Sequence, residues 1–228
     1  MNEIVSLKDI VVDFDGERIL DELSLDIHDK EFVTFLGPSG CGKTSLLSIF
    51  AGILQPSSGK AEVLGAPPDP RANSTGYMLQ RDHLFDWRTI EQNALLGLEV
   101  KKRLNAETHA YAAELLDRYG LGAFKNYYPR QLSGGMKQKA ALIRTLAFSP
   151  ELLLLDEPTT YLDMAHQLEV LELLSSGRIE RMSYDLIGGK YKRVDEDYDF
   201  EKDKSTYTME EGKRELGAAV YLTVKPQE

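Results

Sequence analysis

The sequence predicts an α/β protein whose sheet is mostly parallel, and three observations point to this fold class. Residues 32–36 and 152–155 form two short, almost wholly apolar runs, as strands buried on both faces do. A glycine-rich loop and a helical stretch through Ala51 follow the first run directly. Apolar residues recur at helical spacing over residues 89–119 and 133–148. Strands that alternate with helices in this order favour a parallel sheet.

The N-terminal part predicts a separate antiparallel β subdomain. Residues 4–14 and 19–27 alternate apolar with polar side chains, and Asp15-Gly16 between them supplies a turn. A further strand is expected at residues 76–79, ahead of the helical stretches. These stretches predict a helical subdomain at about residues 84–148.

Two details define the helices of that subdomain. The helical pattern over residues 89–119 breaks near Asn105. Ser133 is placed to cap a helix that reaches Phe148, and Pro150 lies just beyond its end.

Composition narrows the classes of function. The chain has 228 residues, of which 42% are hydrophobic and 28% charged, enough for one substantial soluble domain. Its net charge of -10 argues against nucleic acid as a partner, because phosphates would be repelled. Cys41 is the single cysteine, which excludes an intrachain disulfide and fits a reducing compartment. With no leader pattern at the start and no run of about 20 apolar residues, we expect a cytoplasmic protein.

Residues 37–44 fit the pattern G-x-x-x-x-G-K-[ST], which predicts a phosphate-binding loop and a P-loop NTPase core. Glycines let the backbone curl so that several N–H groups converge on phosphate oxygens, and the following helix adds its positive N-terminus. Lys43 would reach the β- and γ-phosphates, and the Thr44 hydroxyl would ligate Mg²⁺. The alternative, an incidental glycine-rich loop, is weakened by the strand before it and the helix after it. The expected ATP-binding residues here are Gly37, Pro38, Ser39, Gly40, Cys41, Gly42, Lys43, Thr44 and Ser45.

A second motif, Leu152-Leu153-Leu154-Leu155-Asp156-Glu157-Pro158, delivers two carboxylates to the carboxyl end of an apolar strand. Doubly wound sheets hold their ligands at this end of the strands. Asp156 would hold the Mg²⁺ shell through water, and Glu157 would polarise the attacking water as the catalytic residue. The alternative is a buried strand that happens to end in acids, and the phosphate-binding loop upstream argues against it.

The sequence Leu132-Ser133-Gly134-Gly135-Met136, ahead of that strand, resembles the signature of ABC ATPases. A serine and two glycines at the start of a helix form a second anion cradle. The resemblance implies that Ser133, Gly134 and Gly135 face the γ-phosphate held by a partner subunit. Two ATP molecules would then lie between the subunits of a head-to-tail homodimer. The alternative is an ordinary helix cap.

Further positions resemble functional residues of this family. Gln80 lies at the Q-loop position, which implies a contact with Mg²⁺ and water and a link to the membrane partner. Phe14 matches the aromatic residue that stacks on adenine, with a core phenylalanine as the alternative. Asp163 fits the D-loop. His83 and Trp87 would lie on the side that faces the membrane, unless Trp87 packs in the subdomain core.

The resemblance to subfamilies changes along the chain. Residues 76–148, with the Leu-Ser-Gly-Gly-Met form of the signature, look like the nitrate, sulfonate and taurine import group. Residues 156–169 are similar to the iron-chelate importers, and residues 1–44 suit a polyamine-type importer equally well. The chain therefore resembles a mosaic, and no transported solute is assigned from it.

The family pattern ends at about Leu174, so we expect one ABC ATPase domain at residues 1–174 and leave residues 175–228 unassigned. In the family another buried strand and a switch histidine follow at this point, and this sequence shows neither after Leu173. His166 lies on a polar stretch and is expected at the surface. Residues 218–224 are the one strand expected in the C-terminal segment, as a candidate replacement for the missing strand.

The resemblance implies an ATPase subunit that drives solute uptake through a membrane permease, with ATP and Mg²⁺ as cofactors. Its partners would be a second copy of the chain, the permease and, indirectly, a solute-binding protein, and it would lie on the inner face of the cell membrane. One alternative is an ABC-like nucleotide-binding protein with defective hydrolysis, because the switch histidine is missing. Another is a soluble ABC ATPase of the DNA-repair or ribosome-acting type, which the lack of coiled-coil insertions and tandem cassettes disfavours.

Overall fold

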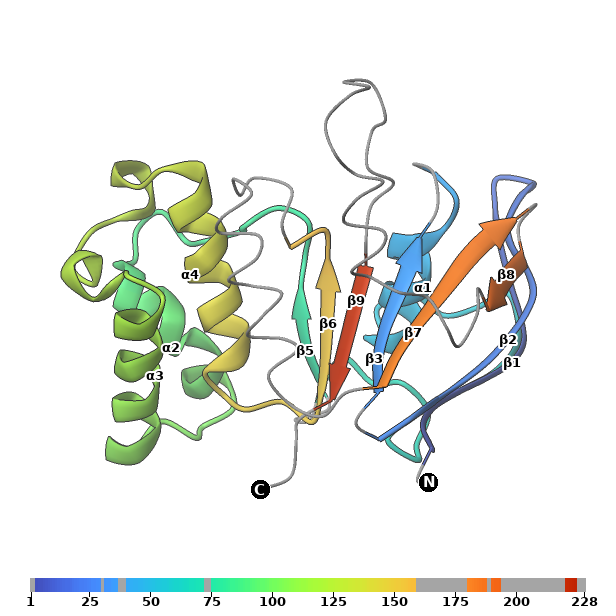
Figure 1. Ribbon diagram of the computed structural model, residues 1–228, viewed down its shortest axis with the longest axis horizontal. Coiled ribbons are helices and arrows are strands. Elements are labelled where there is room, and N and C mark those ends of the chain that lie inside the picture. The colour runs from blue at the N-terminus through green and yellow to red at the C-terminus, as the bar shows by residue number, and fades with distance from the viewer. Residues whose placement is uncertain are drawn as a thin grey trace. The chain divides into compact units, whose positions relative to one another are not determined.

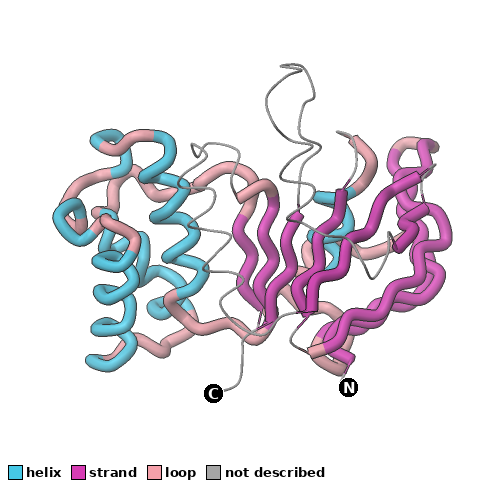
Figure 2. Tube along the Cα trace, in the orientation of Figure 1, coloured by secondary structure: helices cyan, strands magenta, loops and turns pink. Residues whose placement is uncertain are grey.

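Two compact units make up the chain. The first comprises Met1–Pro70 with Ile179–Leu222, and the second comprises Arg71–Arg178 with Thr223–Glu228. The helices, an antiparallel sheet and parallel strand pairs confirm the expected α/β class (Figures 1 and 2). The computed structural model describes residues 3–29, 31–36, 40–71 and 75–158 and, as backbone strands, 180–187, 190–193 and 220–224.

A three-stranded antiparallel sheet lies in the first unit (Figure 2). β1 (Glu3–Phe14) pairs with β2 (Glu17–His28) on one side and with β4 (Ser58–Val63) on the other. Leu23, Leu25 and Ile27 of β2 are buried in alternation, as in a strand that covers a core with one face, and Leu20 is buried beyond a register shift. The expected N-terminal pair is confirmed, whereas β4 was not predicted from the sequence.

Glycines fix two details of this sheet. Asp15 and Gly16 have φ angles of 49° and 84°, the left-handed conformation that a two-residue hairpin turn needs at both positions. Gly59 in β4 has a φ of 94°, and a Cβ there would lie 2.4 Å from the carbonyl oxygen of Asp9. No larger residue fits where β4 passes β1.

The first unit also holds the strand that leads into the glycine-rich loop. β3 (Glu31–Leu36) has Val33 and Phe35 fully buried. After the loop, α1 (Lys43–Phe50) ends at the C-cap residue Ala51. The rings of Phe35 and Phe50 lie 6.3 Å apart between centroids, so the helix packs against the strand that precedes it.

Two strands in the C-terminal segment correct a prediction. β7 (Glu180–Ile187) pairs in parallel with β3, and β8 (Lys190–Arg193) pairs antiparallel with β7. The expectation of a single strand in this segment is therefore wrong, although a strand is present within residues 218–224 as β9 (Val220–Val224). A signal existed in the sequence, because apolar residues alternate through β7 and Gly188-Gly189 is typical of a hairpin connection.

Within residues 75–158, the second unit contains a parallel strand pair and three helices, and the helices lie side by side on the left of Figure 1. Short 3₁₀ turns at Gly122–Phe124 and Pro129–Gln131 lie between the last two of these helices along the chain. The strands are β5 (Thr75–Met78) and β6 (Leu152–Asp156), and the helices are α2 (Ile90–Val100), α3 (Ala106–Arg118) and α4 (Gly134–Leu146). The expected helical subdomain is thus present.

Capping boxes set the starts of the first two of these helices. At α2 the Thr89 hydroxyl accepts from the Gln92 amide at 3.2 Å, and the Gln92 side chain accepts from the Thr89 amide at 2.9 Å. Asn105 and Thr108 make the same reciprocal bonds at α3, both 2.9 Å long. The predicted break near Asn105 is therefore a helix start.

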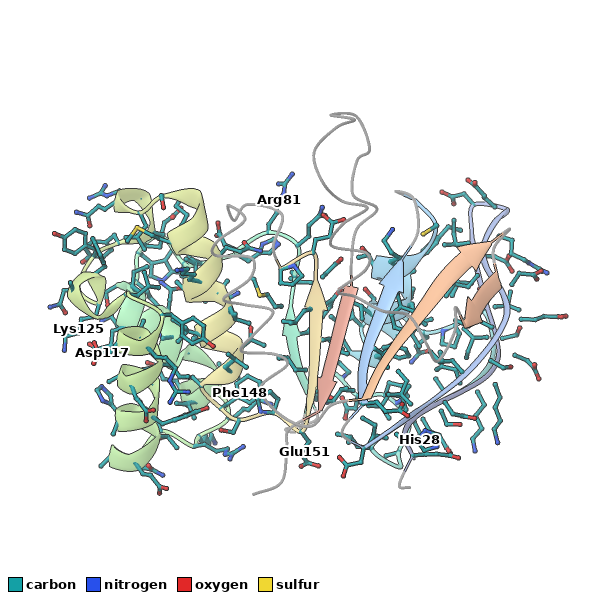
Figure 3. All side chains as sticks on the ribbon, viewed as in Figure 1. His28, Arg81, Asp117, Lys125, Phe148 and Glu151 are labelled. Carbon is teal, nitrogen blue, oxygen red and sulfur yellow. The ribbon has the colours of Figure 1, made fainter. Side chains whose placement is uncertain are left out.

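α2 and α4 pack closely against each other. A Cβ on Gly97 of α2 would lie 2.7 Å from the ring of Phe148, the residue labelled just beyond α4 in Figure 3. The Lys101 amine lies 4.3 Å from the centroid of the same ring, and burial lowers the pKa of Lys101. Among the helices within the described ranges, none is long and apolar enough to cross a membrane.

Candidate functional site

The glycine-rich loop and α1 form the first part of the candidate site. Gly42 directly precedes the helix with a φ of 96°, and a Cβ there would lie 2.8 Å from Leu20 Cδ2. The first turn of α1 carries no acidic residue and its N-cap makes no side-chain hydrogen bond. Such a helix start suits an anion. Three predicted residues of the loop fall outside the described part of the chain: Gly37, Pro38 and Ser39.

Lys43 is the first residue of α1 and is 6% exposed. Its Nζ donates to the Cys41 sulfur at 3.4 Å, so the amine turns back toward the loop that precedes its own helix. Gly40 and Thr44 are exposed, while Cys41 and Ser45 are partly buried. The loop therefore combines a nearly buried cation with an accessible hydroxyl, as a phosphate site with a nearby Mg²⁺ requires.

The acidic end of β6 forms the second part. All five residues of β6 are buried, including Asp156, which is 2% exposed. Glu157 follows with a φ of 48°, an unusual left-handed conformation for a residue with a side chain. The chain thus turns sharply at the strand end and brings the Glu157 carboxylate out of the core, where it is partly exposed.

Gln80 reaches the same place from the neighbouring strand. β5 and β6 are parallel, and Met78 pairs with Leu155, so the residues two positions further along each strand leave the same edge. Gln80 Nε2 accordingly donates to Glu157 Oε2 at 2.7 Å. In Figure 3 the adjacent Arg81 and the preceding Glu151 mark opposite ends of this strand pair. The predicted residues Gln80 and Glu157 are therefore brought together.

The signature residues begin α4. Ser133 is the N-cap, and its hydroxyl accepts from the Met136 amide at 3.3 Å. Gly134 and Gly135 form the first turn, which contains no acidic residue, and nothing lies within 4 Å of a Cβ built on Gly134. The start of this helix is capped by a hydroxyl and has open space at Gly134, a geometry that suits an anion.

Two alternatives from the sequence are decided by exposure. Phe14 at the end of β1 is 48% exposed, so it is not a core residue. Trp87 is 73% exposed and stacks on Phe85 with ring centroids 4.7 Å apart, so it does not fill the subdomain core. Asp163 and His166 lie outside the described residues.

Sequence reasoning missed two polar residues that hold the loop between β5 and α2. Asn93 is fully buried, and its Nδ2 donates to the carbonyl oxygens of Phe85, Arg88 and Thr89 at 2.9–3.2 Å. Arg144 on α4 donates to two further carbonyl oxygens of this loop. The signal in the sequence was a polar residue on the otherwise apolar face of each helix. Such a residue is expected there only if it makes hydrogen bonds, because burying an unpaired polar group is costly.

Comparisons with known proteins place these elements in a family. The sequence family described as ABC transporter matches residues 20–160. The chain is 48% identical over 153 residues to the uncharacterized ABC transporter ATP-binding protein YtlC of Bacillus subtilis (strain 168), covering 67% of this chain and 59% of that protein. It is 35% identical over 171 residues to the taurine import ATP-binding protein TauB of Yersinia pestis bv. Antiqua, covering 75% of this chain and 67% of that protein.

A solved structure agrees with the sequence matches. The dimeric ATP-binding cassette MJ0796, in a post-hydrolysis state with ADP and Pi, superposes with a TM-score of 0.73 at 27% identity, covering 83% of this chain and 97% of the other. The present chain spans less than two thirds of the length of YtlC. Because the family match takes in α1, the Gln80–Glu157 pair and the Ser133-capped helix within more than half of the sequence, this chain belongs to the ABC transporter family of ATP-binding proteins.

Proposed function

We propose that this chain is the ATP-binding subunit of an ABC importer, which binds and hydrolyses MgATP in a head-to-tail dimer to drive solute uptake. The observation that carries this proposal is the hydrogen bond from Gln80 to Glu157 beside the buried Asp156. It gathers a carboxylate that can orient water and two oxygen-bearing side chains at one strand edge. The importer role is supported by the similarity to TauB, whose name specifies taurine import.

ATP fits the described residues of the loop. Gly42 has a left-handed φ of 96°, and Leu20 packs where its side chain would lie, so the loop can curl tightly at the start of α1. A backbone curled in this way can turn its N–H groups toward a phosphate. Lys43 supplies the one cation of the predicted motif and would bind the β- and γ-phosphates. Asp156 and Gln80 each offer a side-chain oxygen atom and Thr44 offers a hydroxyl oxygen, the kind of ligand that Mg²⁺ prefers. When bound, Mg²⁺ supplies positive charge that neutralises the phosphates.

Glu157 would act on the attacking water. In this structure its carboxylate accepts a hydrogen bond from Gln80, which fixes the side chain near the edge of β5 and β6. From there the carboxylate would orient the water and accept its proton. Gln80 would present its amide oxygen to Mg²⁺ while its Nε2 holds the Glu157 carboxylate.

A Lys43→Ala variant tests nucleotide binding. We expect its ATP affinity to fall about 10- to 100-fold, because charge-assisted hydrogen bonds to phosphate are each worth ~1.5–3 kcal/mol. Isothermal titration calorimetry measures the change. The matched control is Lys60→Ala, which removes an exposed lysine that pairs with Glu62 at the surface of the same unit. Equal affinities for Lys43→Ala and the parent would contradict the phosphate-binding role.

A Gly135→Asp variant tests the dimer. The new carboxylate would stand in the first turn of α4 and repel the partner's γ-phosphate, so ATP should bind while the ATP-dependent dimer is lost. Light scattering with and without ATP measures the outcome. Ala123→Asp adds the same charge at an exposed position outside α4 and should leave the dimer intact. A dimer that persists in Gly135→Asp would mean that Ser133, Gly134 and Gly135 do not face the partner's nucleotide.

The proposed partners follow from the importer role. A permease would receive the work of ATP hydrolysis, and a solute-binding protein would act on the permease rather than on this chain. The subunit would then lie on the cytoplasmic face of the membrane. Co-purification of the chain with a permease expressed beside it tests this assignment.

A second candidate is an ABC-like nucleotide-binding protein with defective hydrolysis. Its support is the histidine inventory, because His166 is the only histidine after residue 109 and it precedes the segment where the family carries its switch histidine. His28 and His109 lie beside Glu31 and Glu91, at 3.3 and 3.8 Å, far along the sequence from that segment. A single-turnover rate of about 1 s⁻¹ or more, the low end of typical turnover, would exclude this candidate.

A further inference from the structure

The loop between β5 and α2 is held by one side chain from each of two helices. At its middle, Arg144 Nη1 donates to the His83 carbonyl oxygen at 2.7 Å, and Nη2 donates to the Asp82 carbonyl oxygen at 2.8 Å. At its far end Asn93 binds Phe85 in both directions, accepting from its amide at 2.8 Å and donating to its carbonyl oxygen at 3.1 Å. These side chains hold the loop together with one backbone hydrogen bond within it, from the Arg88 amide to the Phe85 carbonyl oxygen at 3.0 Å.

Arg144 connects this loop to the helix that begins at Ser133. Both residues belong to α4 and its cap, separated by about three helical turns. The backbone hydrogen bonds of the helix connect these two ends through successive turns. The loop residues that Arg144 holds come directly after Gln80 and Arg81. The signature residues thus lie at one end of α4, and Arg144 near the other end binds the loop that contains Gln80.

The two hydrogen bonds that Arg144 donates to the loop fix the orientation of its backbone. The guanidinium is planar and places two N–H donors side by side, so one Arg144 satisfies two consecutive carbonyl groups. His83 between them has a left-handed φ of 45°, and the Asp82 carboxylate accepts from the Leu84 amide at 3.1 Å. Burial lowers the pKa of Arg144, and the Asp82 carboxylate acts in the opposite direction. A partly buried charge whose hydrogen bonds go to the backbone holds the turn more firmly than an exposed one would.

We propose that Arg144 is a positioning residue that ties the loop of Gln80 to the signature helix, so that the placement of α4 sets the aim of Gln80 at Glu157 and at Mg²⁺. This proposal rests on the proposed function, because it gives Gln80 its role toward the metal. Arg144 acts through Gln80 and does not touch nucleotide in this scheme. A purely structural role, in which Arg144 only stabilises the subdomain, is the competing explanation.

A binding cycle separates the two explanations. Arg144→Met is made in the parent and in a Gln80→Ala background, and ATP affinity is measured by calorimetry with Mg²⁺ and in EDTA. In the parent background, we expect Arg144→Met to reduce the increase in ATP affinity caused by Mg²⁺ about tenfold. In the Gln80→Ala background it should have almost no further effect, because the two residues would act through one contact. Affinity in EDTA should stay unchanged. Equal losses in both backgrounds, or no loss in either, would overturn the proposal.

Controls guard against loss of folding and against failure of the proposed function. Arg118→Met removes an exposed arginine that pairs with Glu114 on α3 and should leave the Mg²⁺ effect intact. If thermal unfolding shows that Arg144→Met is unstable, Arg144→Lys takes its place in the test. Lysine keeps the charge but lacks the second donor of the planar guanidinium, so an intermediate loss of the Mg²⁺ effect is expected. An intermediate loss supports the proposal, and parent-like behaviour of Arg144→Lys contradicts it. If the ATP affinity of the parent does not increase with Mg²⁺, the proposed function fails. If the parent gains affinity from Mg²⁺ and Arg144→Met gains as much, only the role of Arg144 fails.

Discussion

A Glu157→Gln variant is expected to lose single-turnover hydrolysis by about 10²–10³-fold, the usual cost of removing one preorganised catalytic contact. A glutamine can still receive a hydrogen bond from Gln80, but it cannot accept the proton of the attacking water. ATP affinity should persist, because Lys43 and the start of α1 are untouched. Quenched-flow measurement at saturating MgATP, with calorimetry for affinity, checks both parts.

The matched control lies at the other end of the same strand. Glu151, labelled in Figure 3, is exposed and directly precedes β6. Glu157 directly follows β6. Glu151→Gln makes the same chemical change without touching the edge that carries Gln80, so its hydrolysis should match the parent. Similar losses in both variants would show that the chemistry does not depend on the position of Glu157.

A Gly59→Ala variant is expected to lower the free energy of unfolding by about 3 kcal/mol or more. Two costs combine in it. Alanine is strained at a φ of 94°, and its Cβ would lie 2.4–2.6 Å from backbone atoms of Lys8 and Asp9, which cannot move without disturbing β1. Chemical denaturation followed by circular dichroism measures the loss.

Gly16→Ala separates these two costs. Its φ of 84° is also left-handed, but nothing lies within 4 Å of a Cβ built there. We expect this control to lose only about 1 kcal/mol, from backbone strain alone. If both variants lose the same amount, the close approach of β4 to β1 contributes nothing to stability.

Elements with a strong local pattern could be predicted from the sequence. The alternation in β1 and β2, the apolar run of β6 and the Asn105 start of α3 each reflect a property of neighbouring residues. The meeting of Gln80 with Glu157 was also predictable in outline, since both follow apolar strands of a parallel sheet and such strands end at a common edge.

Other features depend on contacts between distant residues. β4 is short, polar and begins beside a glycine, so its strand state comes from pairing with β1 rather than from its own preference. The β7 and β8 hairpin had a local signal in the alternating apolar residues of β7, but the many charged residues around it made that pattern hard to recognise. Arg144 could be recognised only when its two carbonyl partners were known, because they lie more than 60 residues earlier in the chain.

The close contact at Gly97 also makes the helical subdomain cooperative. α2 has only 11 residues and contains Gly97 and Asn93, both poor helix formers, and isolated helices below about 12–15 residues are marginal in water. Its helical state therefore depends on the surface of α4 that the missing Cβ allows it to reach. A local opening that separates these two helices would unwind α2 and release the loop that Asn93 holds, in a single step.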